Sequence, residues 1–139
     1  MYLRPASCAW LTASESVADE VLADDFGADA YVRKFEGIDT VLGRVAALLR
    51  SAQASRDRLG ISCLLGPKRI LAVDDSRTYL EELARNLRDD GYEVITAGSG
   101  EEALESLKVD EVDCILLDLL MPGLSGTETC RRIKGTSTL

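Results

Sequence analysis

The stretch RILAVDDSRTYL, residues 69–80, starts as a short apolar run and continues into two adjacent carboxylates, Asp74 and Asp75. The run is continuous rather than alternating, as expected for a parallel strand that is covered on both faces. Two adjacent negative charges repel each other, and a cation held between them removes that repulsion. The pair therefore suggests a bound cation at the end of a buried strand.

Further apolar runs and helical patterns lie on both sides of this stretch. Apolar residues at Leu80, Leu83, Ala84 and Leu87 mark the buried face of a helix that ends at Gly91. Four more helices are indicated by apolar residues within 17–22, by those within 41–49 after Asp39 as N-cap, and by capping-box spacing of Ser99 with Glu102 and Ser125 with Glu128. The five predicted strands span residues 8–12, 30–34, 69–74, 93–97 and 113–118.

Alternation of strands and helices predicts an α/β fold with a doubly wound, five-stranded parallel sheet. Residues 51–67 interrupt the alternation, because they have no clear period and end in Gly66 and Pro67. We interpret them as a linker whose first turn can continue the preceding helix. The chain then divides into residues 1–50, the linker, and residues 68–139.

Composition excludes several classes of function. The net charge of −8 disfavours nucleic acid as a direct ligand. The absence of histidine removes Ser-His-Asp and Cys-His catalysis and every histidine metal site. The four cysteines have no paired spacing, which favours reduced thiols over a zinc site. No apolar stretch approaches the roughly 20 residues of a membrane span, and the first residues lack a signal-peptide layout, so a soluble cytoplasmic protein is expected.

A third carboxylate, Asp118, ends the strand within DCILLDLLMPG. Ligands of open α/β sheets bind outside the carboxyl ends of the strands, so neighbouring strands would bring Asp74, Asp75 and Asp118 together. An all-oxygen cluster selects a hard cation such as Mg²⁺, and an Asp beside it can act as a nucleophile towards phosphorus. The alternative is that these acidic residues form solvated turns or helix caps.

Two further residues fit a phosphate site at the same edge of the sheet. Thr12 ends the run CAWLT and can offer a hydroxyl to a phosphate oxygen, while Lys34 ends AYVRK and can supply a positive charge. Taken singly, Thr12 is better explained as the start of the next helix and Lys34 as a surface lysine. Together they favour a site.

These residues resemble the receiver domain of two-component response regulators. Residues 68–134 resemble its first half, with KRILAVDDS as first strand, GYEVITAGSGEEALE as second strand and helix, and VDCILLDLLMPGLSGTETCRRIK as third strand and helix. The first 50 residues resemble its second half, with CAWLTAS and GADAYVRK as the fourth and fifth strands. The resemblance implies a flavodoxin-like fold in which family strands 4–5 precede strands 1–3.

The resemblance also implies roles for individual residues. Asp74 and Asp75 would hold Mg²⁺, the backbone carbonyl of Leu120 would complete the metal's protein ligands, and Asp118 would be both metal ligand and phosphoacceptor. Thr12 would bond a phosphoryl oxygen, with Lys34 paired to it.

Tyr31 would be the aromatic residue that turns inward on activation. Phe35 departs from the family, which has proline after the lysine, and makes a cis peptide bond there unfavourable by about 3 kcal/mol. We therefore expect an altered turn after Lys34. Leu120 also cannot orient an attacking water, so slow self-dephosphorylation is expected.

The expected function is that of a phosphoacceptor switch, not an enzyme, phosphorylated by a sensor histidine kinase or a phosphotransfer protein. The alternatives are a receiver-like docking module that is never phosphorylated and a domain-swapped fragment of a tandem-receiver regulator. A haloacid-dehalogenase-type phosphohydrolase is disfavoured because Leu120 stands where that chemistry needs a second acid. Closure within one chain predicts the strand order 93–97, 69–74, 113–118, 8–12, 30–34, and we favour that monomer over the swapped dimer.

Overall fold

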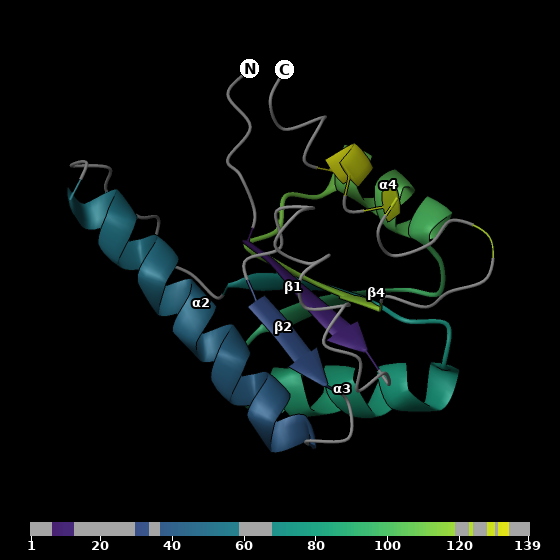
Figure 1. Cartoon of the computed structure of the whole chain (residues 1–139), viewed down its shortest axis with the longest axis horizontal. Coiled ribbons are helices and arrows are strands. Elements are labelled where there is room, and N and C mark those ends of the chain that lie inside the picture. Colours follow the sequence, from purple (N-terminus) through teal and green to yellow (C-terminus); the bar gives the residue numbers. More distant parts are fainter. Residues whose placement is uncertain are drawn as a thin grey trace.

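The computed structural model describes residues 7–12, 30–33, 37–58, 68–118, 123, 128–129 and 131–133. Its centre is a sheet of five parallel strands in the order β2-β1-β5-β3-β4 (Figure 1). The strands are β1 (Ser7–Thr12), β2 (Ala30–Arg33), β3 (Arg69–Val73), β4 (Glu93–Ala97) and β5 (Cys114–Asp118). The predicted α/β fold built on a parallel sheet is confirmed.

Helices cover both faces of the sheet. Helices α2 (Ile38–Arg58) and α3 (Arg77–Asp89) pack on one face, and α4 (Gly100–Val109) packs on the other (Figure 1). Side chains of β3 alternate between the two layers, since Ile70 and Ala72 join the core under α2 and α3 whereas Leu71 and Val73 join the core under α4. This two-sided burial explains why the strand sequences are apolar throughout.

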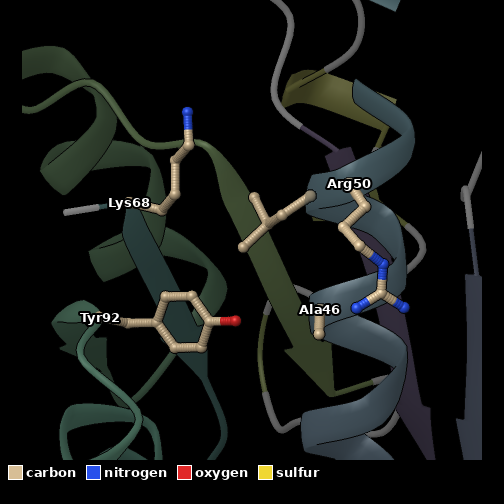
Figure 2. Close-up of a pocket in the computed structure, with 5 residues that line it drawn as sticks. Ala46, Arg50, Lys68 and Tyr92 are labelled. Carbon is tan, nitrogen blue, oxygen red and sulfur yellow. The ribbon is translucent and has the colours of Figure 1, made fainter. Parts of the chain in front are cut away.

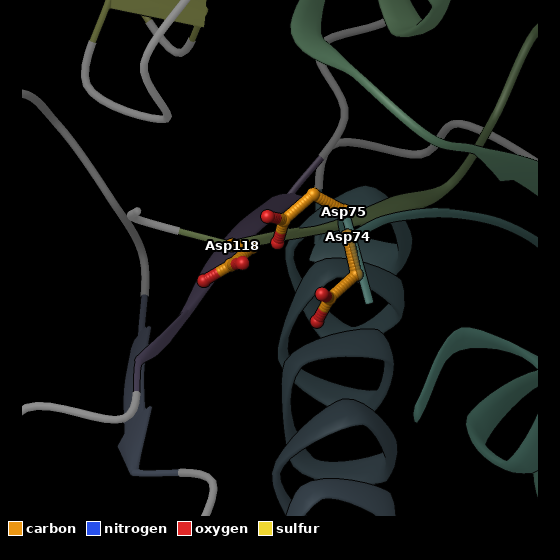
Figure 3. A group of neighbouring side chains, drawn as sticks. All are labelled: Asp74, Asp75 and Asp118. Atoms are coloured by element: carbon orange, nitrogen blue, oxygen red, sulfur yellow. The ribbon is translucent and has the colours of Figure 1, made fainter. Parts of the chain in front are cut away.

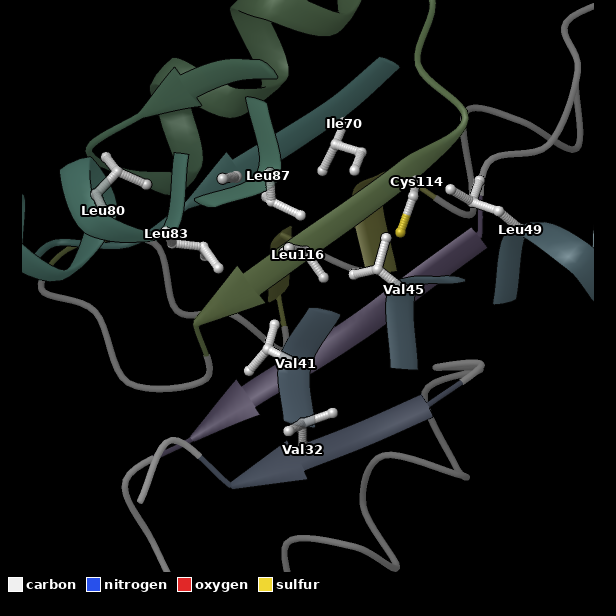
Figure 4. Close-up of a cluster of buried hydrophobic side chains, with 11 residues drawn as sticks. Val32, Val41, Val45, Leu49, Ile70, Leu80, Leu83, Leu87, Cys114 and Leu116 are labelled. Atoms are coloured by element: carbon white, nitrogen blue, oxygen red, sulfur yellow. The ribbon is translucent and has the colours of Figure 1, made fainter. Parts of the chain in front are cut away.

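The larger core joins the two parts of the sequence. Val41, Val45 and Leu49 of α2 pack with Leu116 of β5 and with the apolar face of α3 (Figure 4). The predicted α3 stripe is confirmed, because its buried residues are Leu80, Leu83, Ala84 and Leu87. Residues 37–58 and 68–118 therefore bury each other's apolar surface.

The side chain of Asp113 fixes the register between β3 and β5 where the two strands begin. The carboxylate Oδ2 of Asp113 accepts a hydrogen bond of 2.9 Å from the backbone N–H of Arg69. The backbone N–H of Asp113 in turn donates to the carbonyl of Arg69 at 2.8 Å. Because Asp113 is buried, this reciprocal pair aligns the two strands that carry the acidic residues at their other ends.

Two helix ends follow the predicted signals. Gly91, at φ 95°, ends α3 in a Schellman motif, where its N–H donates to the carbonyl of Arg88 and the N–H of Tyr92 donates to that of Leu87. Ser99 caps α4 by accepting from the N–H of Glu102 at 3.1 Å.

Helix α2 differs from the prediction at both ends. It begins at Ile38, so Asp39 lies in its first turn, where a negative charge is favourable, rather than at the N-cap. It continues to Arg58, so the linker assigned to residues 51–67 starts inside the helix. Residues 51–58 contain no glycine or proline, and their alanine, glutamine and arginine residues favour helix.

Two predicted helices, within 17–22 and after Ser125, fall largely or wholly outside the described residues. Over the ranges that the structure does describe, no helix combines the length and apolarity that crossing a membrane requires.

Candidate metal and phosphoacceptor site

Three carboxylates meet at the carboxyl ends of β3 and β5. Asp74 directly follows β3, and Asp118 is the last residue of β5. Because Val73 pairs with Leu117, Asp74 and Asp118 occupy the next position along the two strands and lie side by side. One oxygen each of Asp74, Asp75 and Asp118 lies within 4.8 Å of the others (Figure 3). The predicted convergence of the three residues is present.

Two of the three carboxylates are buried. Asp74 is 1% exposed and Asp118 is 3% exposed, whereas Asp75 is open to solvent. Asp74 is fixed on two sides: its Oδ1 accepts from the backbone N–H of Ser76 at 2.8 Å, and its own N–H donates to the carbonyl of Ala97 at 3.1 Å. The end of β4 therefore holds the main chain of Asp74, and the start of α3 holds its carboxylate.

This donor set suits a hard divalent cation. Isolated buried carboxylates are costly, and two of them side by side repel each other strongly. Oxygen ligands in a cluster without histidine or cysteine are the type that Mg²⁺ prefers. Because one face of the group is open at Asp75, a cation can reach the site from solvent and keep part of its hydration shell.

Tyr79 is a neighbour of this site that sequence reasoning missed. Burial, followed by the charges of Asp74, Asp118 and Glu82, raises the pKa of Tyr79 from 10.0 to about 12. The available signal was its place four residues after Asp75, about one helical turn along the chain, but that spacing also fits an ordinary core residue.

The other predicted site residues are located only in part. Leu11 pairs with Asp118 across β1 and β5, so the main chain of Thr12 follows at the same edge of the sheet. The main chain of Tyr31 lies in β2, paired with Trp10. The side chains of Thr12 and Tyr31, together with all of Lys34 and Leu120, fall outside the described residues.

A separate pocket of about 310 Å³ lies beside α2, at the opposite edge of the sheet. Lys68 and Tyr92, which line it, come just before β3 and β4, and the tyrosine hydroxyl points towards α2 (Figure 2). The remaining lining residues are Ala46, Leu49 and Arg50. The pocket is thus distinct from the acidic cluster, which follows the carboxyl ends of the strands.

Comparison with known proteins places the acidic cluster in a family. The sequence profile of the response regulator receiver domain matches residues 70–138. The response regulator MprA of Mycobacterium leprae is 48% identical over 68 residues, which cover 49% of this chain and 30% of that relative. The chain therefore spans well under half the length of this curated relative.

Two solved structures are similar in fold and sequence. Chemotaxis protein CheY4 of Vibrio cholerae has a TM-score of 0.51 and 36% identity, over 52% of this chain and 60% of that one. Response regulator protein TrrA of Thermotoga maritima, solved in complex with Mg²⁺ and BeF, has a TM-score of 0.50 and 42% identity, over 51% of this chain and 62% of that one. Residues 70–138 are therefore a response regulator receiver sequence of two-component signalling.

Proposed function

We propose that this chain is a Mg²⁺-dependent phosphoacceptor module, in which Asp118 accepts a phosphoryl group from the phosphohistidine of a sensor kinase or phosphotransfer protein. The observation that carries the proposal is the buried Asp118 at the end of β5, with an oxygen within 4.8 Å of the Asp74 and Asp75 carboxylates. The TrrA neighbour, solved with Mg²⁺ and BeF, supports the choice of cation.

The proposed transfer is a simple displacement at phosphorus. A carboxylate oxygen of Asp118 forms the new P–O bond while the P–N bond of the phosphohistidine breaks. The imidazole leaves with the electron pair and takes up a proton from solvent. Asp74 and Asp75, with the backbone carbonyl of Leu120, would hold Mg²⁺, which offsets negative charge on the transferred group.

The first part of the chain would supply the rest of the site. We assign β1 and β2 as family strands four and five, which places them before strands one to three in the sequence. The pairing of Leu11 with Asp118 supports this assignment, because it sets Thr12 at the edge where a phosphoryl group on Asp118 would lie. Thr12 would then bond a phosphoryl oxygen, Lys34 would pair with it, and Tyr31 would repack in the phosphorylated state.

The test is the intact mass of the protein after incubation with Mg²⁺ and acetyl phosphate. We expect one added phosphoryl group, which is lost without Mg²⁺ and in Asp118→Asn. Glu111→Gln, which changes an exposed acidic residue just before β5, is the matched control and should remain phosphorylated. A Mg²⁺-binding protein that gains no phosphoryl group would instead be a docking module.

The oligomeric state is tested separately. The pairing of β1 with β5 can be made within one chain, so we propose a closed monomer. Light scattering during size-exclusion chromatography should give the mass of one 15.1 kDa chain. A stable dimer that still binds Mg²⁺ would favour the domain-swapped arrangement.

A further inference from the structure

The pocket beside α2 is built from both parts of the chain. Ala46, Leu49 and Arg50 line it from α2, whereas Lys68 and Tyr92 line it from the positions just before β3 and β4. Its volume of about 310 Å³ lies at the lower end of the range for small-molecule sites. A molecule in this pocket would therefore contact α2 and the edge of the sheet at the same time.

The lining combines apolar surface with positive charge. Ala46, Leu49 and the ring of Tyr92 are apolar, and the hydrocarbon stems of arginine and lysine side chains extend such a surface. None of the five lining residues is acidic, although the chain carries a net charge of −8. The pocket therefore suits a molecule that is apolar over most of its surface and negatively charged at one end.

Two hydrogen-bond donors lie on opposite walls of the pocket. The Tyr92 hydroxyl points towards α2, and the Arg50 guanidinium lies beside Ala46 on the helix (Figure 2). Burial, followed by the charges of Asp90 and Cys114, raises the pKa of Tyr92, whereas the charge of Arg50 lowers it. The guanidinium thus acts on this hydroxyl. A phenol and a guanidinium together suit an anionic oxygen, and the neighbouring charge of Asp90 favours a ligand with one negative charge over one with two.

We propose that this pocket binds a small apolar carboxylate, with a single negative charge and a short hydrocarbon body. The carboxylate accepts hydrogen bonds from Tyr92 and Arg50, Lys68 adds positive charge, and the hydrocarbon packs on Ala46 and Leu49. Binding links α2 to the sheet and so stabilises the folded protein. The inference does not rest on the proposed phosphoacceptor function, because the acidic cluster lies at the other edge of the sheet.

The test is an NMR titration of the whole chain with hexanoate. The backbone amide signals of Ala46, Arg50 and Tyr92 should shift and saturate, with a dissociation constant on the order of 1 mM for so small a ligand. Two further probes separate the parts of the ligand: hexan-1-ol keeps the hydrocarbon without the charge, and acetate keeps the charge without the hydrocarbon. Each should bind roughly 5-fold or more weakly than hexanoate.

Variants identify the groups that hold the carboxylate. Arg50→Gln should weaken hexanoate binding by roughly 3- to 10-fold, because a hydrogen bond to a charged group is lost, and Tyr92→Phe should weaken it by roughly 3-fold. Arg44→Gln is the matched control, because it removes the same charge from an exposed position of α2 outside the pocket lining. It should change the affinity less than twofold.

Three results would overturn the inference: shifts that do not saturate or do not include the lining residues, equal affinity for hexanoate and hexan-1-ol, or an equal loss in Arg50→Gln and Arg44→Gln. The last result would mean that the anion responds to the general charge of the helix. Phosphorylation enters none of these measurements, so failure of the proposed function would leave their outcome unchanged.

Discussion

Removing the charge of Asp118 should stabilise the protein when no divalent cation is present. The change Asp118→Asn keeps the size of the side chain and removes one of two buried, adjacent negative charges. The native carboxylate would be retained for its chemistry at a cost in stability, as expected when a site is built to bind a cation.

The size of the effect follows from the separation of the carboxylates. Two unit charges with oxygens within 4.8 Å of each other repel by at least about 3.5 kcal/mol at an effective dielectric constant of about 20. Burial of the new amide offsets part of this gain, because its N–H groups need hydrogen-bond partners at a position that is 3% exposed. We therefore expect a net gain of about 1–2 kcal/mol in the free energy of unfolding.

Urea unfolding in EDTA and in excess MgCl₂ measures both parts of this expectation. In the wild type, Mg²⁺ at 100 times its dissociation constant should add about 2.7 kcal/mol. In Asp118→Asn most of that increment should vanish, because the cation loses a charged ligand. Glu111→Gln removes an exposed charge and controls for the lower net charge.

Two results would refute the reasoning. One is an Asp118→Asn variant that is less stable than the wild type in EDTA, because repulsion would then not dominate at this site. The other is an undiminished Mg²⁺ increment in the variant, because the cation would then bind elsewhere.

Four further predictions concern the stability of the fold. Gly91→Ala should lower the unfolding free energy by about 1 kcal/mol, because φ is 95° there. Gly43→Ala, in α2 with open space at its Cβ, should raise it by up to about 1 kcal/mol in the same urea assay. Asp113→Ala should cost about 1–3 kcal/mol, since the partly buried N–H of Arg69 loses its acceptor, and hydrogen exchange should quicken at that amide. The neutral side chain of Tyr79 should contribute to the free energy of unfolding in full below pH 10, and this contribution should be lost as the pH rises towards 12, because the pKa of Tyr79 is about 12 in the folded protein and 10.0 in the unfolded chain. In Tyr79→Phe, the unfolding free energy should depend less on pH over that range.

Sequence patterns predicted the parts of the fold in which one signal dominates. The short, continuous apolar run Ile70 to Val73 favours a strand buried on both faces, and its residues do enter both cores. Parallel pairing then forces the carboxylates at neighbouring strand ends to one edge, so convergence of Asp74 with Asp118 follows from topology. The end of α3 was equally clear, since Gly91 supplies the left-handed conformation that a Schellman motif requires.

Other features depend on balances that a sequence pattern does not resolve. The end of α2 is set by weak propensities over residues 51–58, where no breaker marks a boundary. The capping box at Ser99 differs from the standard motif in one hydrogen bond. The carboxylate of Glu102 accepts from the N–H of Gly98 rather than from the N–H of Ser99. Tyr79 was missed because its link to the site depends on how its ring packs, whereas helical spacing alone is typical of a core residue.

The two parts of the chain supply different chemistry to the proposed site: one binds the cation, and the other captures the phosphoryl group. The carboxylates come from β3 and β5, whose pairing and Asp113 contact lie entirely within residues 68–118. Capture of the phosphoryl group, as proposed, needs Thr12 and Lys34, which depend on β1 pairing with β5 from the other part of the sequence. Cation binding should therefore tolerate substitutions in β1 that disturb its pairing with β5. Phosphoryl transfer should not, because it is sensitive to displacements of about 1 Å. A junction variant that binds Mg²⁺ normally but is phosphorylated slowly would place the fault in the pairing of β1 with β5, not in the acidic cluster.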